Sequence, residues 1–514
     1  MDVNDEGDRR SPRWLGPVIG LVTAGVALGV AHLVAGWVNA AASPIITVGE
    51  GAIDSSPTWL KSFAIRSFGT NDKRVLLLGI GVVIVLAAIT LGDAALRRPR
   101  SGWIGLAIFV AVGAIAALTR PGASVSDLLP VLAGAVAGAV TLRALLGAAD
   151  RPTTGPVQTP VASLDRRHFL WTAGVGAIVA IGAGGAGGFL SRRFRADDSR
   201  ASVRLPAPTS PASDAPPGLD AVDGISPFFT PNDRFYRVDT ALLVPAVTAE
   251  DWQLRIHGMV DRELTLTYDQ LLARPLIERD VTLTCVSNPV GGHYLGNARW
   301  IGAALADILK EAGVHPGADQ LVARSVDGFT VGTPTAALLD GRDAMLAIGM
   351  NGEPLPISHG FPVRVVVPGL YGYVSATKWV VDMELTTFGA YDAYWIARGW
   401  AQQAPIKTES RIDVPHGTVG AGQRDIAGIA WAQHVGIDAV EVQIDNGAWL
   451  PAELAPQDTT DTWRQWRLGW DAVPGAHQIA VRATDRNGVT QTSDLAEPFP
   501  DGATGYHTVT VTVH

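Results

Sequence analysis

The sequence predicts a multi-domain protein with an all-α transmembrane anchor, a mixed α+β domain and a C-terminal β-sandwich. Its mean hydropathy of +0.20 and its 17% of charged residues are too apolar for an ordinary soluble enzyme of this length. The chain also changes character near residue 200. Residues 1–200 carry 19 Lys and Arg against 13 Asp and Glu, whereas residues 201–514 carry 21 against 36. The acidic second part argues against nucleic acid as a partner, because phosphate binding needs a basic face.

The anchor is predicted from five apolar runs that are rich in glycine and alanine. Each run is close to the roughly 20 residues that cross a bilayer as a helix, although the third is short. We therefore expect residues 1–195 to hold five transmembrane helices in a lipid bilayer. The runs are Leu15–Val38, Val75–Leu91, Trp103–Leu118, Leu128–Leu146 and Phe169–Leu190.

Two further boundaries follow from composition. Residues 196–222 are rich in Pro, Ala, Ser and Asp without periodicity, which predicts an extended linker. Residues 223–398 mix strand patterns with a helix expected at Ala303–Ala312 that ends before Gly313. In residues 399–514 the helical signal disappears, and alternating stretches separated by Asp-Asn-Gly and Arg-Asn-Gly turns predict a small β-sandwich. The expected strands are Trp252–His257, Val281–Thr284, Val363–Val367, Val440–Ile444, Gln478–Arg482 and Thr508–Val513.

The single cysteine, Cys285, follows an apolar strand pattern and precedes a polar loop. One cysteine excludes an intrachain disulfide framework. Three interpretations remain open from the residue alone. It is a buried structural thiol, a nucleophile with His293 as its base, or a soft thiolate ligand to a redox metal.

Downstream motifs bear on this choice, because several of them match one family in order and approximate spacing. The Thr-Cys-x-x-Asn loop, the Asn-Gly-x-Pro-Leu-Pro stretch and the His-Gly-Phe-Pro-Val-Arg stretch resemble the sulfite oxidase family of molybdopterin-dependent oxidoreductases, of a membrane-anchored bacterial type. The resemblance covers roughly residue 224 to the C-terminus. It is carried by Thr230–Arg237, Thr284–Asn288, Met350–Pro356, His359–Arg364, Lys378–Trp379, Ile406–Ile412 and Gly428–Trp431.

The resemblance implies a molybdenum-molybdopterin cofactor and oxygen-atom transfer on a small oxo-compound. Cys285 would then be the protein ligand to molybdenum, and Arg364 would bind the pterin phosphate. It also implies an immunoglobulin-like, dimerisation-type sandwich and a possible homodimer. The catalytic residues it implies are Cys285, Arg237 and Tyr391. The cofactor-binding residues it implies are Asn232, Tyr236, Cys285, Ser325, His359, Arg364, Ser375, Thr377 and Lys378.

The sequence departs from the family where the substrate is expected to bind. Sulfite oxidases follow this cysteine loop with a basic pair, whereas here Asn288 is followed by the uncharged Pro289–Gly292. Arg237 remains, and Tyr394 competes with Tyr391 for the position of the family's tyrosine. Sulfite and a sulfoxide are therefore comparable substrate candidates.

Other cofactors are not expected. The apolar runs offer only His32, with His168 at the foot of the fifth, whereas a haem between helices usually needs two axial histidines. Electrons must then pass to or from a separate partner. The G-x-G-x-x-G pattern at Gly182–Gly187 lies inside an apolar helix, so neither NAD nor FAD is expected.

The pair Arg166-Arg167 before the fifth run resembles a twin-arginine export signal. We therefore expect a multi-pass protein of the bacterial cell membrane whose C-terminal catalytic domain is extracytoplasmic. The main alternative is a non-catalytic cell-surface receptor that binds a partner through the sandwich. A transport unit in residues 1–195 is disfavoured, because the runs hold few ionisable groups.

Overall fold

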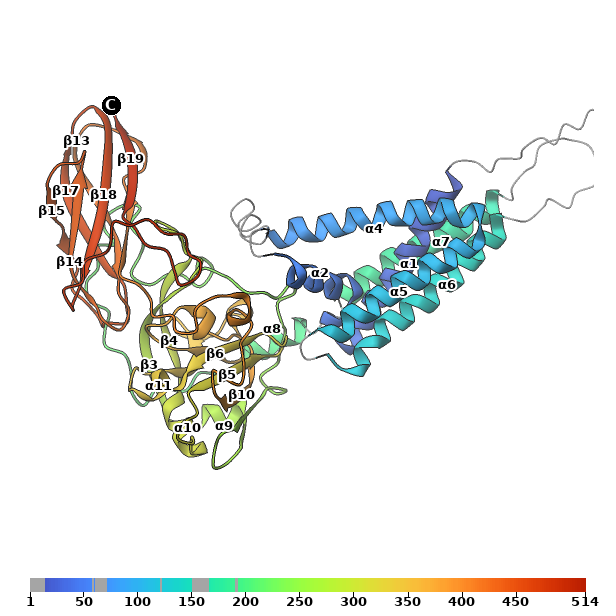
Figure 1. The fold of residues 1–514 in the computed structure, drawn as a ribbon, viewed down its shortest axis with the longest axis horizontal. Helices are drawn as coiled ribbons and strands as arrows, with labels where there is room; N and C mark the ends of the chain where they lie inside the picture. The colour runs from blue at the N-terminus through green and yellow to red at the C-terminus, as the bar shows by residue number, and fades with distance from the viewer. Residues whose placement is uncertain (1–13, 58–59, 61–71, 121–122, 150–165, 190–192) are drawn as a thin grey trace, which may run out of the picture. The chain divides into compact units, whose positions relative to one another are not determined.

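The computed structural model describes the chain except residues 1–13, 58–59, 61–71, 121–122, 150–165 and 190–192 (Figure 1). It divides into two compact units. The first comprises residues 1–194 with 241–244, and the second comprises residues 195–240 with 245–514. Each unit is considered by itself.

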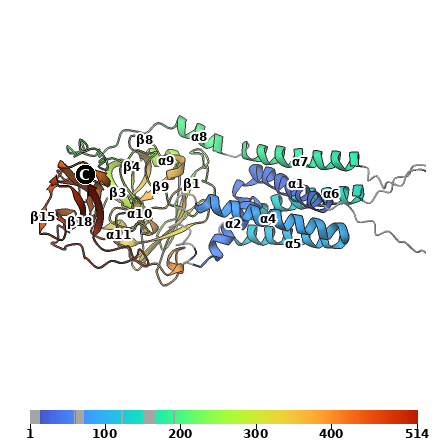
Figure 2. The same cartoon turned by 90° about the horizontal axis from the view of Figure 1, so that it is seen from above.

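The first unit is all-α. Helices α1, α4, α5, α6 and α7 lie side by side in both views (Figures 1 and 2), and α1 packs against α4, α6 and α7. The short α2 was not predicted. It begins at Pro44, a residue that favours the first turn of a helix. The helices are α1 (Leu15–Val38), α2 (Pro44–Ser55), α4 (Asp72–Arg97), α5 (Pro99–Thr119), α6 (Leu128–Ala149) and α7 (Arg166–Phe189).

Four segments in the described residues are long and apolar enough to cross a membrane. They are Leu15–Val38, Val75–Arg97, Pro99–Thr119 and Val125–Ala149. The fifth predicted run forms α7, whose described apolar part is the shorter segment Leu170–Gly185. A multi-pass membrane anchor is therefore supported, and the fifth crossing stays a prediction.

Small residues let these helices approach closely. A Cβ atom on Gly92 of α4 would run into the backbone of Gly16 and Gly20 on α1. The outer faces carry large apolar side chains instead, such as Leu78 at 71% and Ile181 at 77% exposure. This pattern, with small residues between helices and large ones outside, is typical of helices packed in lipid.

The second unit begins with a helix, which corrects the predicted linker. Residues 196–202 belong to α8 (Arg193–Ser202), where the hydroxyl of Ser199 donates to Glu250 at 2.7 Å. From residue 203 the segment has no helix, as predicted. It is held along a strand edge, because the Thr209 amide donates to the Leu276 carbonyl at 2.8 Å.

A mixed α+β domain follows, as predicted, with two sheets. One sheet has the order β2 (Leu264–Thr267), β1 (Gln253–Gly258), β10 (Val380–Thr386), β5 (Gln320–Ser325) and β6 (Thr330–Pro334). The other has the order β3 (Leu276–Thr284), β4 (Leu295–Ala304), β7 (Met345–Met350) and β8 (Glu353–Pro354), with β9 (Arg364–Val366) paired to β7. The helices are α9 (Tyr268–Leu272), α10 (Leu305–Ala312) and α11 (Thr335–Leu339).

Most predicted elements of this domain shift by only a few residues. Helix α10 starts two residues later than predicted, because Ala303 and Ala304 complete strand β4. It ends as predicted, with Gly313 at φ +73° in the left-handed region that glycine favours. Strand β3 is longer than predicted and runs to Thr284, which places Cys285 directly after its end.

The C-terminal part is a β-sandwich of two sheets, as predicted. One sheet has the order β11 (Glu409–Val414), β13 (Gly422–Trp431), β17 (Arg464–Ala472) and β16 (Glu453–Leu454). The other has the order β12 (Gly417–Val419), β19 (His507–Val513), β18 (Gly475–Asp485), β14 (Ile437–Ile444) and β15 (Trp449–Pro451). The predicted Asp-Asn-Gly turn joins β14 to β15, with Asp445 and Asn446 both at positive φ. Trp466, Val442 and Ile479 are buried between the sheets.

Candidate functional site

The loop that follows β3 fixes Cys285 through its backbone. The Cys285 amide donates to the Tyr294 carbonyl at 2.9 Å, and the Asn288 amide donates back to the Cys285 carbonyl at 3.0 Å. The Asn288 side-chain oxygen accepts from the Tyr294 amide at 2.8 Å. These contacts form a closed loop in which Cys285 is largely buried. Burial raises the pKa of the Cys285 thiol, while hydrogen bonds from Ser287 and the charge of Lys378 act in the opposite direction.

Tyr236 lies next to this loop. Its pKa is raised first by burial and then by the charge of Cys285, and Arg364 opposes the shift. A Cβ atom on Gly372 would lie 3.8 Å from the Thr284 carbonyl and 3.9 Å from the Tyr236 hydroxyl. The structure therefore brings Tyr236 to the end of β3, beside the thiol.

Arg364, on β9, is a buried cation. It is 4% exposed, and its guanidinium lies 5.0 Å from the centre of the Trp300 ring. Its polar contacts in the described chain are carbonyls, at 3.2 Å to His359 and 3.5 Å to Val365, and no described carboxylate pairs with it. Burial lowers the pKa of Arg364 to about 10. A buried cation without a counter-ion is costly, so this position favours an anionic ligand.

His359 is a neutral neighbour of this cation. Its Nε2 lies 3.2 Å from the Asn232 carbonyl, an arrangement that requires the proton to be on Nε2. Burial lowers the pKa of His359 to about 3, and the charges of Arg364 and Lys378 add to the shift. Gly360, at φ +111°, allows the close approach: its Cβ atom would lie 3.0 Å from Arg364 Cβ and 3.2 Å from Lys378 Cα.

Lys378 and Arg237 share one carboxylate. Lys378 Nζ lies 3.1 Å from Asp239 Oδ2, and Arg237 Nε lies 2.7 Å from the same oxygen. Burial lowers the pKa of Lys378 to about 8, against the attraction of Asp239. With Arg364 included, three cations face one carboxylate, and the site is positive. Sequence reasoning missed Asp239, because nothing in its sequence context marks it as a partner of a lysine 139 positions away.

Two predicted hydroxyls are buried without a partner in the described chain. Ser325 Oγ and Thr377 Oγ1 have no hydrogen bond, and the residues are 3% and 1% exposed. Ser325 pairs across the sheet with Val380, and the Thr377 carbonyl accepts from the Val365 amide at 2.8 Å. Ser325 thus ends β5, and Thr377 lies in an irregular segment that is bonded to Val365, next to Arg364 in the chain. Ser375 differs, because its hydroxyl donates to the Leu370 and Tyr371 carbonyls at 2.9 and 3.0 Å.

Asn232 and Tyr391, two residues predicted for the site, form hydrogen bonds with other protein groups in this structure. The Asn232 amide donates to Glu353 at 2.6 Å and to the Met350 carbonyl at 3.3 Å, and its oxygen accepts from Asn351 at 2.9 Å. The Tyr391 hydroxyl lies 3.4 Å from Thr330 Oγ1 on β6. The roles of Asn232 and Tyr391 in binding and catalysis stay predictions.

Tyr371, which the sequence did not single out, is within electrostatic range of the thiol. The charge of Cys285 contributes to the raised pKa of Tyr371, after burial and the buried carboxylate Glu409. The pKa of His293, considered as a base for Cys285, is lowered first by burial and then by the charge of Arg411, and Cys285 is not among the causes. The nucleophile interpretation of Cys285 therefore gains no support from its surroundings.

Comparison with known proteins gives consistent matches. The family model described as "Oxidoreductase molybdopterin binding domain" matches residues 241–395. A mitochondrial sulfite oxidase of Drosophila melanogaster is 35% identical over 242 residues, which is 42% of this chain and 40% of that protein. A sulfite oxidase of Gallus gallus is 29% identical over 319 residues, which is 52% of this chain and 69% of that protein.

A shorter bacterial protein is covered over most of its length. The uncharacterized oxidoreductase YuiH of Bacillus subtilis (strain 168) is 33% identical over 149 residues, which is 29% of this chain and 72% of that protein. The matches to the longer relatives leave much of their length uncovered, with 40% of the Drosophila protein spanned. The family model covers the residues that include Cys285, Arg364 and Lys378, whereas Arg237 lies just before the matched range.

Proposed function

Because the chain belongs to the sulfite oxidase family of molybdopterin-binding oxidoreductases, we propose that it transfers an oxygen atom to or from a small oxo-compound at molybdenum ligated by Cys285. The observation that carries this proposal is the buried Arg364, which has no carboxylate partner among the described residues and lies within electrostatic range of Tyr236. Such a cation needs an anionic ligand, and the phosphate of molybdopterin supplies one.

The residues present fit this cofactor. Arg364 offers a planar donor set for the phosphate, and the unpartnered hydroxyls of Ser325 and Thr377 offer two further donors. His359 presents a neutral ring, and Cys285 presents a soft sulfur at the end of β3. When bound, molybdenum-molybdopterin supplies two-electron redox chemistry and oxygen-atom transfer.

The chain itself binds and orients the substrate. Arg237, whose side chain is 38% exposed, is the cation most open to a small oxyanion or a polarised oxo group. Asp239 fixes Arg237 and Lys378 together, so both charges stay in place without a bound ligand. The loop from Pro289 to Gly292 adds no charge. This supports sulfite and sulfoxides as rival substrates.

The full chain, purified in detergent after expression with the cofactor, tests the proposal. Molybdenum measured by mass spectrometry and pterin measured by fluorescence after oxidation should approach one of each per chain. Turnover should follow with either sulfite and an electron acceptor or a sulfoxide and an electron donor. A chain that retains neither molybdenum nor pterin contradicts the proposal. The non-catalytic receptor alternative is set aside, because the chain belongs to an oxidoreductase family.

We also propose that the anchor places the catalytic unit outside the cytoplasm of a bacterial cell, with a separate redox partner and no haem of its own. Arg166 and Arg167 begin α7, and Ser163–Asp165 lie outside the described residues. Changing both arginines to lysine should leave residues beyond 200 protected from protease added to spheroplasts, while the unmodified protein is cleaved. Protection of the unmodified protein contradicts this orientation.

A further inference from the structure

Three side chains of the β-sandwich reach the loop that carries Cys285. Arg411 on β11 donates through Nη1 to the Gly292 carbonyl at 2.7 Å. Gln433, which follows β13, donates through Nε2 to Thr284 Oγ1 at 2.8 Å. His507 on β19 lies so close to Gly291 that a Cβ atom there would run into its ring. The sandwich thus contacts the chain on both sides of the cysteine.

Arg411 is held rigidly. Its Nε donates to Asp413 Oδ1 at 2.7 Å, and its Nη2 donates to Ser226 Oγ at 2.7 Å. Asp413 in turn accepts from the Ser226 amide at 2.9 Å through its other oxygen. Arg411 and Asp413 are 5% and 8% exposed. A buried, doubly anchored guanidinium gives the Gly292 carbonyl a fixed partner, since bonds from a charged donor are the stronger ones.

Gly292 is connected to Cys285 by a hydrogen bond and a close contact within the loop. Its amide donates to the Pro289 carbonyl at 2.8 Å, which closes a second turn after the Cys285–Asn288 turn. A Cβ atom on Gly292 would lie 2.5 Å from the Asn288 oxygen that accepts from Tyr294. The loop is therefore tightly packed from Cys285 to Tyr294, and displacement of Gly292 would disturb the turn at Cys285.

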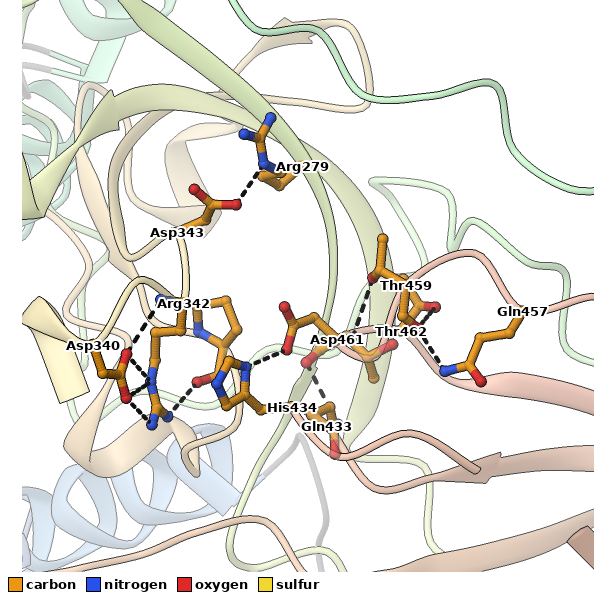
Figure 3. A network of polar contacts seen from close by, with 12 residues as sticks. Arg279, Asp340, Arg342, Asp343, Gln433, His434, Gln457, Thr459, Asp461 and Thr462 are labelled. Carbon is orange, nitrogen blue, oxygen red and sulfur yellow. Dashed lines mark hydrogen bonds and ion pairs between the residues drawn. The ribbon is translucent and has the colours of Figure 1, made fainter. Parts of the chain in front are cut away.

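Gln433 acts on the other side of the cysteine. It is 2% exposed, and it lies beside the polar network of Arg342, His434 and Asp461 where the two domains of this unit meet (Figure 3). In that network the Asp461 carbonyl accepts from the Thr282 amide at 2.9 Å, and the Trp463 amide donates to Thr282 Oγ1 at 2.8 Å. The last residues of β3 are thus bound to the sandwich immediately before Cys285.

We infer that Arg411 and Gln433 are positioning residues for Cys285, so that the β-sandwich forms part of the active site. Neither residue touches the thiol; they fix the backbone on its two sides. The catalytic consequence rests on the proposed function, because it assumes that Cys285 ligates molybdenum. The structural consequence does not, because it concerns only how firmly the loop is held.

The chain has one cysteine, so a thiol reagent reports on this loop alone. The probe is 5,5′-dithiobis(2-nitrobenzoic acid) added to the metal-free full chain in detergent. Burial slows reaction of the thiol while the loop is closed, so local opening of the loop speeds labelling. Loss of a charge-assisted bond in Arg411→Gln should therefore speed labelling by about tenfold or more. Arg411→Lys should restore part of the protection. Gln433→Met, which keeps the side-chain volume, should speed labelling to a smaller extent.

Arg464→Gln is the matched control. Like Arg411, Arg464 donates to the protein backbone, at 2.7 Å to the Ala455 carbonyl and at 2.9 Å to the Ile437 carbonyl, but both acceptors lie within the sandwich. It should lower the thermal midpoint of the protein and leave the labelling rate unchanged. Equal labelling of Arg411→Gln and the wild type overturns the inference, and so does equal acceleration by Arg464→Gln. If Arg411→Gln does not fold by circular dichroism, an unchanged rate in Gln433→Met overturns it.

The same reagent separates this inference from the proposed function. Molybdenum-loaded wild type should label far more slowly than the metal-free chain, because a ligated sulfur is not free to react. Equal rates would show that Cys285 is not the ligand, whatever the variants do. In loaded enzyme, Arg411→Gln should lower kcat with little change in KM, since the residue does not meet the substrate.

Discussion

The two units bury opposite kinds of side chain. In the helical unit, glycine and alanine fill the contacts between helices, and large apolar side chains such as Ile104, at 60% exposure, face outward. In the catalytic unit, Arg364 and Arg411 are buried at 4% and 5% exposure. The first arrangement gains stability from close backbone approach. The second carries a cost of charge burial, which Asp413 offsets for Arg411 and which a bound anion would offset for Arg364. One unit is thus built for a lipid environment and the other for a charged ligand.

The largest effect expected in the catalytic unit comes from Cys285→Ser. The hydroxyl is a harder and weaker donor than the thiolate, while the side-chain volume hardly changes. Mutation of a residue that hydrogen-bonds to a metal ligand costs roughly 10–100-fold in metal affinity or activity. Loss of the ligand itself should cost more. Turnover and the molybdenum content of the full chain measure this, with circular dichroism as the control for folding. Retention of most turnover in the serine variant would show that the sulfur is not a ligand.

Arg364→Gln tests the cost of the buried charge in the catalytic unit. It should weaken cofactor binding without lowering the stability of the metal-free protein. Hydrogen bonds to charged groups contribute about 1.5–3 kcal/mol each, so the variant should retain roughly tenfold less cofactor or worse. The metal-free variant should be as stable as the wild type or more stable, because an uncompensated buried cation is gone. Pterin content and the thermal midpoint measure the two effects. Arg255→Gln is the control, because the Arg255 side chain is 53% exposed and pairs only with Glu263 among described carboxylates. Destabilisation of the metal-free Arg364→Gln protein would contradict this account.

In both units the sequence predicts the elements that depend on local properties. Helix α1 coincides with its predicted apolar run, Leu15–Val38, because length and hydropathy are local properties. The sandwich strands and their Asp-Asn-Gly turn are likewise predicted by local alternation and turn chemistry. Helix α2 was missed because its 12 residues include Glu50 and Asp54 and form no long apolar run.

In the site, the residues with a family motif were predicted, and those that act through contacts distant in sequence were not. Cys285, His359 and Arg364 stand in recognisable stretches. Asp239 stands in no such stretch, and Arg411 was not singled out within Ile406–Ile412, because the importance of both comes from partners 139 and 119 positions away in the chain. A single sequence holds no signal for such pairings. A charged residue that looks like part of an ordinary surface strand pattern can therefore be a buried contact of the active-site loop.

A substitution between the helices of the first unit should change the stability of the protein and leave its turnover unchanged. Gly92→Leu places a side chain where α4 meets α1, and overpacking of this kind costs about 1–3 kcal/mol. Gly79→Leu in the same helix is the matched control, because no atom lies within 4 Å of its Cβ position. The thermal midpoint in detergent should fall for the first variant and not for the second. Turnover per bound molybdenum should stay unchanged in both, since the site lies in the other unit. A loss of turnover per molybdenum in Gly92→Leu alone would show coupling between the units.

The last expected effect is a dependence of stability on pH that belongs to the catalytic unit. The pKa of His359 is about 3 in the folded protein, below its ordinary value of 6.5, because burial and nearby cations disfavour the charged ring. As the pH falls below 6.5, the unfolded chain takes up a proton that the folded chain does not. The free energy of unfolding should therefore fall by about 1.4 kcal/mol per pH unit from this residue. His507, with its pKa lowered to about 4, adds a second contribution of the same sign.

Denaturant titration of the metal-free full chain between pH 7 and pH 5 measures this dependence, with pulsed labelling of Cys285 as the signal, because the only thiol lies in the catalytic unit. In His359→Gln the unfolding free energy should fall with pH less steeply than in the wild type, by about 1.4 kcal/mol per pH unit. His507→Gln should reduce the slope by a similar amount. Because the two histidines lie in different domains of the unit, the double variant should show both reductions additively. A slope that His359→Gln leaves unchanged would mean that the ring is not held neutral beside Arg364 and Lys378. The positive character of the site, on which binding of an anionic cofactor depends, would then need another explanation.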